Sequence, residues 1–388
     1  MSSHEEATGV RPVADVPPVH GPPAVRLLDP DGRIVDGPAA DELLPMIDAL
    51  DDETLRRFHR DMVVTRCIDD EGANLQRQGQ LALWIPIRGQ EAAQVGLVHA
   101  SRPQDHFFPS YREHAVGFAR GIDPVDIIRM LRGVTHGGWD PAAHQNFHLY
   151  TVVLGSQTLH ATGYAMGIAF DGASGTGDPG RDEAVVAFFG DGASSQGDVS
   201  EAMVFAASFQ TPELFFLQNN HYAISVPVER QSRTPLYWRG EGFGIPSTQI
   251  DGNDVLASYA VSRRDLDAAR AGGGPRLIEA LTYRIGAHTT SDDPTKYRSQ
   301  AELDSWVARD PILRFERYLR SRGESDAFFA EVDEEARDLA DDVRRRTIAL
   351  EKPEIGVMFD HVYSEPHPRI DEQRAWFQQY EASFGGRS

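Results

Sequence analysis

The sequence of 388 residues has a single cysteine, Cys67, and no long apolar run. One cysteine excludes a disulfide framework and a zinc site built from cysteines, and it is typical of a reducing cytoplasm. No segment reaches the roughly 20 apolar residues needed to span a bilayer. The N-terminus also lacks a basic region followed by an apolar stretch, so we expect no secretion signal and a cytoplasmic location.

Positive charge is also scarce. The chain has 38 Lys and Arg residues against 59 Asp and Glu residues, which gives a formal net charge of -21. A protein that binds nucleic acid needs basic surface to neutralise phosphates, so we exclude nucleic acid as a partner. An anionic small molecule would need positive charge that is concentrated locally. The hydrophobic content of 40% is that of an ordinary globular protein.

Composition divides the chain into an arm and a folded part. Residues 1–23 are rich in Pro, Ser and Glu without apolar periodicity, which predicts a disordered arm. Residues 24–388 are expected to form one domain, with an α/β core at about residues 80–300 and a helical C-terminal part at about residues 300–388. A hairpin is expected at residues 25–35, around a turn that contains Pro and Gly.

Apolar periodicity predicts that helices alternate with buried strands. Helices are expected at residues 51–78, 90–99, 113–120, 125–131, 157–170, 196–209, 255–271 and 371–384. Short, mostly apolar runs predict strands at residues 184–189, 213–218 and 276–283. This alternation predicts an α/β fold with a mainly parallel central sheet, flanked by helices and extended by helical N- and C-terminal parts.

The helix expected at residues 157–170 carries small side chains at Gly163, Ala165, Gly167 and Ala169. Part of its surface therefore has no bulky group, and another helix could approach it closely. Tight packing within this chain and a subunit interface both explain the pattern, and the sequence does not separate them.

Two polar motifs follow neighbouring predicted strands. Gly190-Asp191-Gly192 comes after one strand, and Asn219-Asn220 ends the next. Ligands of open parallel sheets bind beyond the carboxyl ends of the strands, so we expect both motifs at one site. The two glycines let the backbone approach a diphosphate, while the Asp191 carboxylate and the Asn220 amide oxygen are ligands that magnesium accepts.

The pair of motifs resembles the thiamin-diphosphate motif. Gly-Asp-Gly alone is usually a turn, but here 26 residues (193–218) separate it from Asn219-Asn220 across strand, helix and strand. From about residue 25 to the C-terminus, the chain is similar to the α subunits of branched-chain 2-oxo acid dehydrogenases. The segments that carry this similarity are Gln76-Arg77-Gln78-Gly79, Tyr111-Arg112-Glu113, residues 251–255 and residues 277–298, with residues 283–293 the most specific.

The resemblance implies a site for thiamin diphosphate and Mg²⁺. The Mg²⁺ ligands would be the side chains of Asp191 and Asn220 and the main-chain oxygen of Tyr222. The cofactor would be held by Tyr111, Arg112, Leu154, Gly190, Gly192, Ala193, Gln218, Arg284 and His288. His288 is the implied catalytic residue, as an imidazole donor near the substrate that titrates close to neutral pH. Thr151, Ser156 and Gln157 resemble a K⁺ site that braces the cofactor loop.

Some residues depart from the family or stay ambiguous. Gln218 stands where the animal branch has an arginine that reaches the diphosphate, so we expect that contact to be weaker or supplied elsewhere. The glycine-rich residues 172–180 precede a strand instead of following it, which excludes a dinucleotide fingerprint. His144 and His148 are expected to be structural or solvent-facing. The hydroxyls of residues 289–291 are either regulatory phosphorylation sites or ordinary loop residues, and the second interpretation is favoured.

The function that the resemblance implies is oxidative decarboxylation of branched-chain 2-oxo acids of the 3-methyl-2-oxobutanoate type, followed by reductive acylation of the lipoyl group of an acyltransferase. A β subunit would complete the active site in a two-α, two-β assembly that docks on the lipoylated acyltransferase core. The alternatives are the same role with pyruvate or acetoin, and a catalytically silent scaffold that binds partners.

Overall fold

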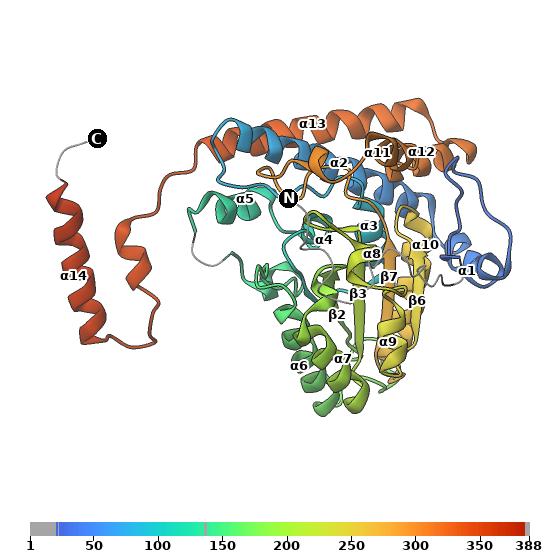
Figure 1. Ribbon diagram of the computed structural model, residues 1–388, viewed down its shortest axis with the longest axis horizontal. Helices are drawn as coiled ribbons and strands as arrows, with labels where there is room; N and C mark the ends of the chain where they lie inside the picture. Colours follow the sequence, from blue (N-terminus) through green and yellow to red (C-terminus); the bar gives the residue numbers. More distant parts are fainter. Residues whose placement is uncertain (1–20, 22, 136–137, 385–388) are drawn as a thin grey trace, which may run out of the picture.

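The computed structural model describes residue 21, residues 23–135 and residues 138–384, so nearly all of the expected arm lies outside the described residues. Its centre is a parallel sheet in the order β1-β2-β3-β7-β6 (Figure 1). The strands are β1 His106–Phe108, β2 Val185–Gly190, β3 Glu213–Asn219, β6 Ser247–Asp251 and β7 Arg276–Leu281. A small antiparallel pair, β4 Tyr222–Ala223 and β5 Val226–Pro227, follows the end of β3.

Helices cover both faces of the sheet, which confirms the predicted α/β fold. The helices are α1 Pro38–Asp48, α2 Asp52–Arg77, α3 Glu91–Ala100, α4 His114–Ala119, α5 Pro124–Arg132, α6 Ser156–Phe170, α7 Gly197–Phe209, α8 Val228–Gln231, α9 Trp238–Gly242, α10 Val255–Arg270, α11 Gln300–Val307, α12 Pro311–Ser321, α13 Asp326–Ile348 and α14 Pro368–Ser383. Short 3-10 turns lie at Pro141–His144, Ala193–Ser195, Pro294–Lys296 and Ile355–Phe359.

Side chains of β2 alternate between two apolar cores. Val186 and Phe188 pack in the larger core with α2, α3 and α10, whereas Val185 and Phe189 pack with α6 and α7 on the opposite face. This alternation follows from the two-residue repeat of a strand, and burial on both faces explains the continuous apolar run in the sequence. The two layers hold the carboxyl ends of the strands in fixed positions.

Helix α2 is the long helix expected at residues 51–78. Asp51 caps it by accepting a hydrogen bond from the backbone N–H of Thr54 at 2.8 Å. Gly72 in this helix lies against the indole of Trp84, where an added Cβ would come within 2.3 Å of the ring. The glycine therefore lets residues 84–90 pack directly on α2, and this segment leads to the functional site.

Several elements differ from the expectation. Strands β1 and β6 were not predicted, because β1 has only three residues and β6 reads Ser-Thr-Gln-Ile-Asp, with little apolar character. The expected hairpin at residues 25–35 is a turn with one antiparallel bridge, between Leu28 and Ile34. Helix α14 begins at Pro368, slightly before the expected start.

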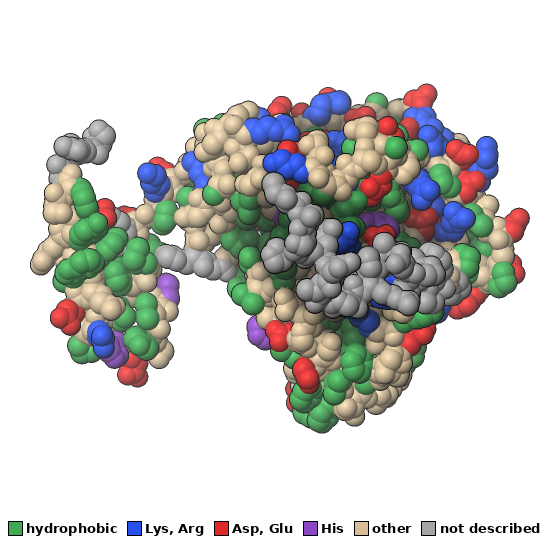
Figure 2. Space-filling view, in the orientation of Figure 1, with side chains coloured by type: hydrophobic (Ala, Val, Ile, Leu, Met, Phe, Trp, Pro, Cys, Tyr) green, Lys and Arg blue, Asp and Glu red, His purple; other side chains and the backbone are tan. Residues whose placement is uncertain are grey.

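The C-terminal segment, from the 3-10 turn at Ile355–Phe359 to α14, lies apart from the body of the molecule (Figure 1). Figure 2 shows that hydrophobic side chains gather on it, and Trp376, Tyr380 and Phe384 are among its exposed aromatic residues. Over the residues that the structure describes, no helix combines the length and the apolar character that a membrane crossing requires.

Candidate functional site

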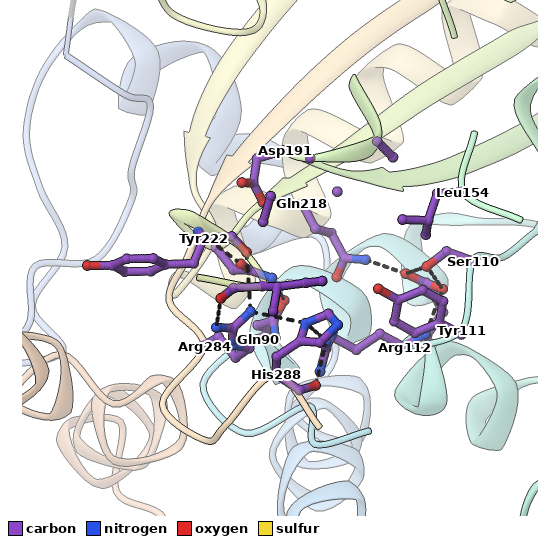
Figure 3. Close-up of a pocket in the computed structure, with 17 residues that line it drawn as sticks. Gln90, Ser110, Tyr111, Arg112, Leu154, Asp191, Gln218, Tyr222, Arg284 and His288 are labelled. Carbon is purple, nitrogen blue, oxygen red and sulfur yellow. Dashed lines mark hydrogen bonds between the residues drawn. The ribbon is translucent and has the colours of Figure 1, made fainter. Parts of the chain in front are cut away.

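A cavity of about 210 Å³ opens beyond the carboxyl ends of β2 and β3 (Figure 3). It is lined by Gln90, Ser110, Tyr111, Arg112, Glu113, Leu154, Gly190, Asp191, Gly192, Ala193, Gln218, Asn220, Tyr222, Ala223, Ile224, Arg284 and His288. All of the residues that the sequence assigned to the cofactor and to Mg²⁺ therefore lie in the wall of one cavity. Figure 3 shows Asp191 at the upper side of this cavity and Arg284 and His288 at its lower side.

The expected metal ligands meet at this edge of the sheet. Asp191 is 2% exposed, and its Oδ2 accepts a hydrogen bond from Gln231 Nε2 at 2.9 Å. Burial raises the pKa of the Asp191 carboxyl above its ordinary value. Between Asn220 and Tyr222 the chain passes through His221, whose φ of 71° is a left-handed conformation. This kink lets both neighbours of His221 line the cavity.

Gly192 brings two loops into contact. A Cβ atom at this position would lie 2.7 Å from the Cβ of Ala223, which is closer than side chains tolerate. Only glycine therefore lets the segment after β2 lie against residues 222–224, and the backbone stays open to a ligand.

Two buried arginines supply the local positive charge. Arg112 is 6% exposed and Arg284 is 1% exposed, and neither has a carboxylate partner within 4.0 Å among the described residues. Arg284 instead donates to the main-chain oxygens of Tyr222 at 3.2 Å and Ile224 at 2.7 Å, and burial lowers the pKa of Arg112. Buried cations that no carboxylate contacts directly are costly unless a ligand supplies negative charge. The cavity is therefore suited to an anion such as a diphosphate.

Both arginines face His288. Its Nδ1 atom lies 3.3 Å from Nη2 of Arg112 and 3.2 Å from Nη1 of Arg284. Guanidinium groups only donate, so Nδ1 accepts and the ring proton sits on Nε2. Burial, together with the two cations, lowers the pKa of His288 to about 4. In this structure the pKa of His288 therefore lies below the near-neutral value expected from the sequence, and the imidazole is neutral at pH 7.

A model of the dehydrogenase E1 component family matches residues 59–353, which is most of the chain. The chain belongs to this family. It is 45% identical over 353 residues to the 3-methyl-2-oxobutanoate dehydrogenase subunit alpha of Mycobacterium tuberculosis, covering 90% of this chain and 92% of that protein. It is 38% identical to the pyruvate dehydrogenase E1 component subunit alpha of Acholeplasma laidlawii, covering 83% and 92%, and 33% identical to that of Staphylococcus epidermidis, covering 92% and 93%.

The E1 chain has further cavity residues that sequence reasoning missed: Gln90, Ser110, Glu113, Ala223 and Ile224. Glu113 belongs to the Tyr-Arg-Glu segment. This segment indicated that Glu113 lies near the site, but it did not reveal its hydrogen-bond partners. The Glu113 carboxylate accepts hydrogen bonds from Ser110 Oγ at 2.9 Å and Gln218 Nε2 at 2.6 Å, and burial raises its pKa. Gln218 Oε1 accepts in turn from Gln94 Nε2 at 2.9 Å. Both the oxygen and the nitrogen of the Gln218 amide therefore have partners within the protein.

A buried aspartate supports the E1 site from behind. Asp69 of α2 accepts hydrogen bonds from Trp84 Nε1 at 2.8 Å, the Ile87 N–H at 3.0 Å and the Arg88 N–H at 3.1 Å. The main-chain N–H of Trp84 donates to Thr290 Oγ1 at 3.1 Å, and the main-chain N–H of Thr290 donates to the main-chain oxygen of Trp84 at 3.1 Å. Asp69 therefore fixes the segment on which the loop of His288 rests. The hydroxyl of Thr290 already has a structural role.

The remaining candidates lie outside the cavity. Gln157 is buried, donating to the Phe188 oxygen at 2.8 Å and accepting from Gly155 N–H at 3.0 Å. The Thr151 N–H donates to the Ser110 oxygen at 2.7 Å, and Ser156 Oγ donates to the Val153 oxygen at 2.8 Å. His148 stacks on Phe108 with ring centroids 4.0 Å apart, and His144 Nδ1 lies 3.0 Å from the Gly121 oxygen. Neither histidine lines the cavity.

Proposed function

We propose that this chain is the α subunit of a branched-chain 2-oxo acid dehydrogenase that uses thiamin diphosphate and Mg²⁺. It takes part in the oxidative decarboxylation of acids of the 3-methyl-2-oxobutanoate type and in the reductive acylation of a lipoyl group. The observation that carries this proposal is the cavity in which Asp191 and Asn220 join two buried arginines that have no carboxylate partner among the described residues. The higher identity to the 3-methyl-2-oxobutanoate enzyme than to the pyruvate enzymes favours the branched-chain substrate.

The donor set fits the cofactor. Oxygens of Asp191, Asn220 and the Tyr222 main chain are the hard ligands that Mg²⁺ prefers when it also bridges phosphates. Arg284 Nε is buried without a hydrogen-bond partner in the described structure and is available to a diphosphate oxygen. Gly192 leaves backbone exposed at the same place. Bound thiamin diphosphate supplies the electron-accepting ring that makes decarboxylation of a 2-oxo acid possible.

The residues of this chain provide binding, orientation and electrostatics. Arg112 and Arg284 keep His288 neutral with its proton on Nε2, so we expect that N–H to donate to the anionic substrate or its carbonyl oxygen. The arginines also offset negative charge that a strongly acidic protein could not otherwise hold. Leu154 lines the cavity mouth as an apolar contact for the cofactor or the substrate chain.

The β subunit is expected to cover the mouth of the cavity. Val152 and Val153, next to Leu154, are 74% and 72% exposed, and Ile224, which also lines the cavity, is 55% exposed. Apolar side chains so exposed beside a cavity are typical of a surface that a partner buries. We therefore propose the two-α, two-β assembly, bound to a lipoylated acyltransferase core. We place this complex in the cytoplasm, on the basis of the single Cys67.

We further propose a K⁺ ion near Thr151, Ser156 and Gln157. These residues connect the cavity wall at Ser110 to β2 at Phe188, so an ion there would stiffen the loop that carries Leu154. Replacing K⁺ by Na⁺ in the buffer is expected to weaken cofactor binding. Equal affinity in the two salts argues against the ion.

Expression of the chain with and without its β partner tests the proposal. The complex should bind thiamin diphosphate in the presence of Mg²⁺ and should turn over 3-methyl-2-oxobutanoate faster than pyruvate or acetoin, while the α chain alone should be inactive. Faster turnover of pyruvate would assign the alternative substrate. A complex that does not bind the cofactor would support the scaffold alternative instead.

A further inference from the structure

Gln90 is a buried amide in the cavity wall whose role is unassigned. Its side chain is fully buried and lines the cavity together with Asn220, Arg284 and His288 (Figure 3). Gln90 Oε1 accepts a hydrogen bond from Asn220 Nδ2 at 3.3 Å, whereas Gln90 Nε2 has no partner in the described structure. Buried donors almost always have a hydrogen-bond acceptor, so we expect this N–H to need one.

The neighbouring contacts fix the orientation of each amide. The Tyr222 N–H points to Asn220 Oδ1 at 3.4 Å, so this oxygen lies on the Tyr222 side and Asn220 Nδ2 lies on the Gln90 side. Because Asn220 Nδ2 only donates, Gln90 must turn its oxygen toward it. The Nε2 group of Gln90 is then left without a partner. Reversing both amides would remove the contact with the Tyr222 N–H.

The backbone around Gln90 is held rigidly. Gly89 has a φ of +97°, and a Cβ there would come within 2.3 Å of the Tyr283 oxygen. The main-chain oxygen of Gly89 accepts a hydrogen bond from Thr282 Oγ1 at 2.7 Å, and the main-chain N–H of Gly89 donates to Glu91 Oε2 at 2.9 Å. Gln90 is therefore placed against the end of β7 before any ligand arrives. Such preorganisation reduces the entropic cost of a hydrogen bond to a ligand.

We propose that Gln90 is a binding and positioning residue for the diphosphate end of the cofactor. Its Nε2 donates a hydrogen bond to an anionic diphosphate oxygen, and its Oε1 holds the Asn220 amide so that the Asn220 oxygen stays available to the metal. The diphosphate is the expected acceptor because Gln90 contacts Asn220, an expected metal ligand, and diphosphate oxygens bound to that metal would lie near this ligand. This inference rests on the proposed function.

The test uses two variants of the assembled α and β subunits after removal of the cofactor. Gln90→Met keeps the volume but removes both hydrogen bonds, whereas Gln90→Glu keeps an acceptor for Asn220 and replaces the donor by negative charge. The dissociation constants of thiamin diphosphate and of inorganic pyrophosphate, each with saturating Mg²⁺, are measured by isothermal titration calorimetry. Both constants should rise at least about tenfold in both variants, which equals about 1.4 kcal/mol.

The Mg²⁺ requirement separates the two roles of Gln90. At saturating cofactor, the half-saturating Mg²⁺ concentration should rise in Gln90→Met and stay within about twofold of wild type in Gln90→Glu, because only methionine releases Asn220. The KM for the 2-oxo acid should not change in either variant. Gln378→Met and Gln378→Glu, at an exposed position of α14, are the matched controls and should bind the cofactor like wild type.

The outcomes distinguish this inference from the proposed function. If the wild-type complex does not bind thiamin diphosphate with Mg²⁺, the proposed function itself is wrong. If the wild type binds but both folded Gln90 variants bind equally well, or if Gln90→Glu binds more tightly, the assignment of Gln90 is wrong. The melting temperature and the size-exclusion volume of each complex establish that the variants are folded and assembled.

Discussion

Replacement of Asp69 by asparagine is expected to destabilise the segment that supports the loop of His288. The Asp69 carboxylate accepts three hydrogen bonds, from Trp84 Nε1, Ile87 N–H and Arg88 N–H. Asparagine keeps one oxygen but turns an N–H toward the remaining donors. At least one buried donor then loses its acceptor, at a cost of about 1 to 3 kcal/mol.

The difference in stability between wild type and Asp69→Asn should become smaller as pH rises. Burial, as the largest cause, raises the pKa of Asp69 from 3.8 to about 7 in the folded chain. The folded state therefore holds the Asp69 proton more tightly than the unfolded state does. The stability that comes from this proton is fully present below the pKa of Asp69 in the unfolded chain. It is lost as pH rises through about 7, the pKa in the folded chain. Between pH 5.5 and pH 8 the wild type therefore loses about 2 kcal/mol of its free energy of unfolding. The Asp69→Asn variant does not lose this contribution, because asparagine does not titrate.

Differential scanning calorimetry of wild type and Asp69→Asn at pH 5.5 and pH 8 measures both effects. The wild type should melt higher at pH 5.5, and the gap between the two melting temperatures should shrink by about 3 °C at pH 8 for a chain of this length. The kcat should also fall in the variant, because Trp84 holds Thr290 near His288. Asp70→Asn, at the adjacent and largely exposed carboxylate, is the control. A gap that widens toward pH 8 refutes the reasoning.

Three further changes probe the cavity itself. Gly192→Ala should weaken thiamin diphosphate binding at least about tenfold, because the new Cβ would push residues 222–224 away, and overpacking costs about 1 to 3 kcal/mol. Calorimetric titration measures this, and unchanged affinity contradicts the close approach. Arg284→Gln should raise the same dissociation constant by about tenfold or more, since hydrogen bonds to charged groups contribute about 1.5 to 3 kcal/mol; an affinity equal to that of wild type excludes the contact. His288→Asn should lower kcat by about 10²- to 10⁴-fold. Since the pKa of His288 is about 4, removing it should delete no inflection between pH 6 and pH 8, and loss of such an inflection contradicts the neutral donor.

The parts of the fold that the sequence predicted correctly rest on local patterns. The apolar residues of β2 and β3 are buried on both faces, so the burial of these strands could be read directly. Asp191 and Asn220 follow those two strands, which is why their shared position could be predicted. Strand β6 was missed because its Ser, Thr and Gln side chains do not form an apolar run, and its pairing with β7 defines it as a strand.

The contacts that set the pKa values and the side-chain positions in the site join segments that are far apart in the sequence. The pKa of His288 depends on Arg112, 176 residues away in the chain, and no local pattern reveals that pair. Gln90 faces Asn220 across 130 residues for the same kind of reason. Sequence reasoning therefore placed His288 in the cavity wall but did not reveal the surroundings that lower its pKa. It gave no signal for Gln90 or Asp69.

The most direct test is a crystal structure of the α and β complex with thiamin diphosphate and Mg²⁺ bound. We predict one magnesium ion at roughly 2.0 to 2.1 Å from an Asp191 carboxylate oxygen and the Asn220 amide oxygen, with diphosphate oxygens completing its coordination. A metal and diphosphate bound elsewhere, with Asp191 and Asn220 contacting neither, would contradict the account.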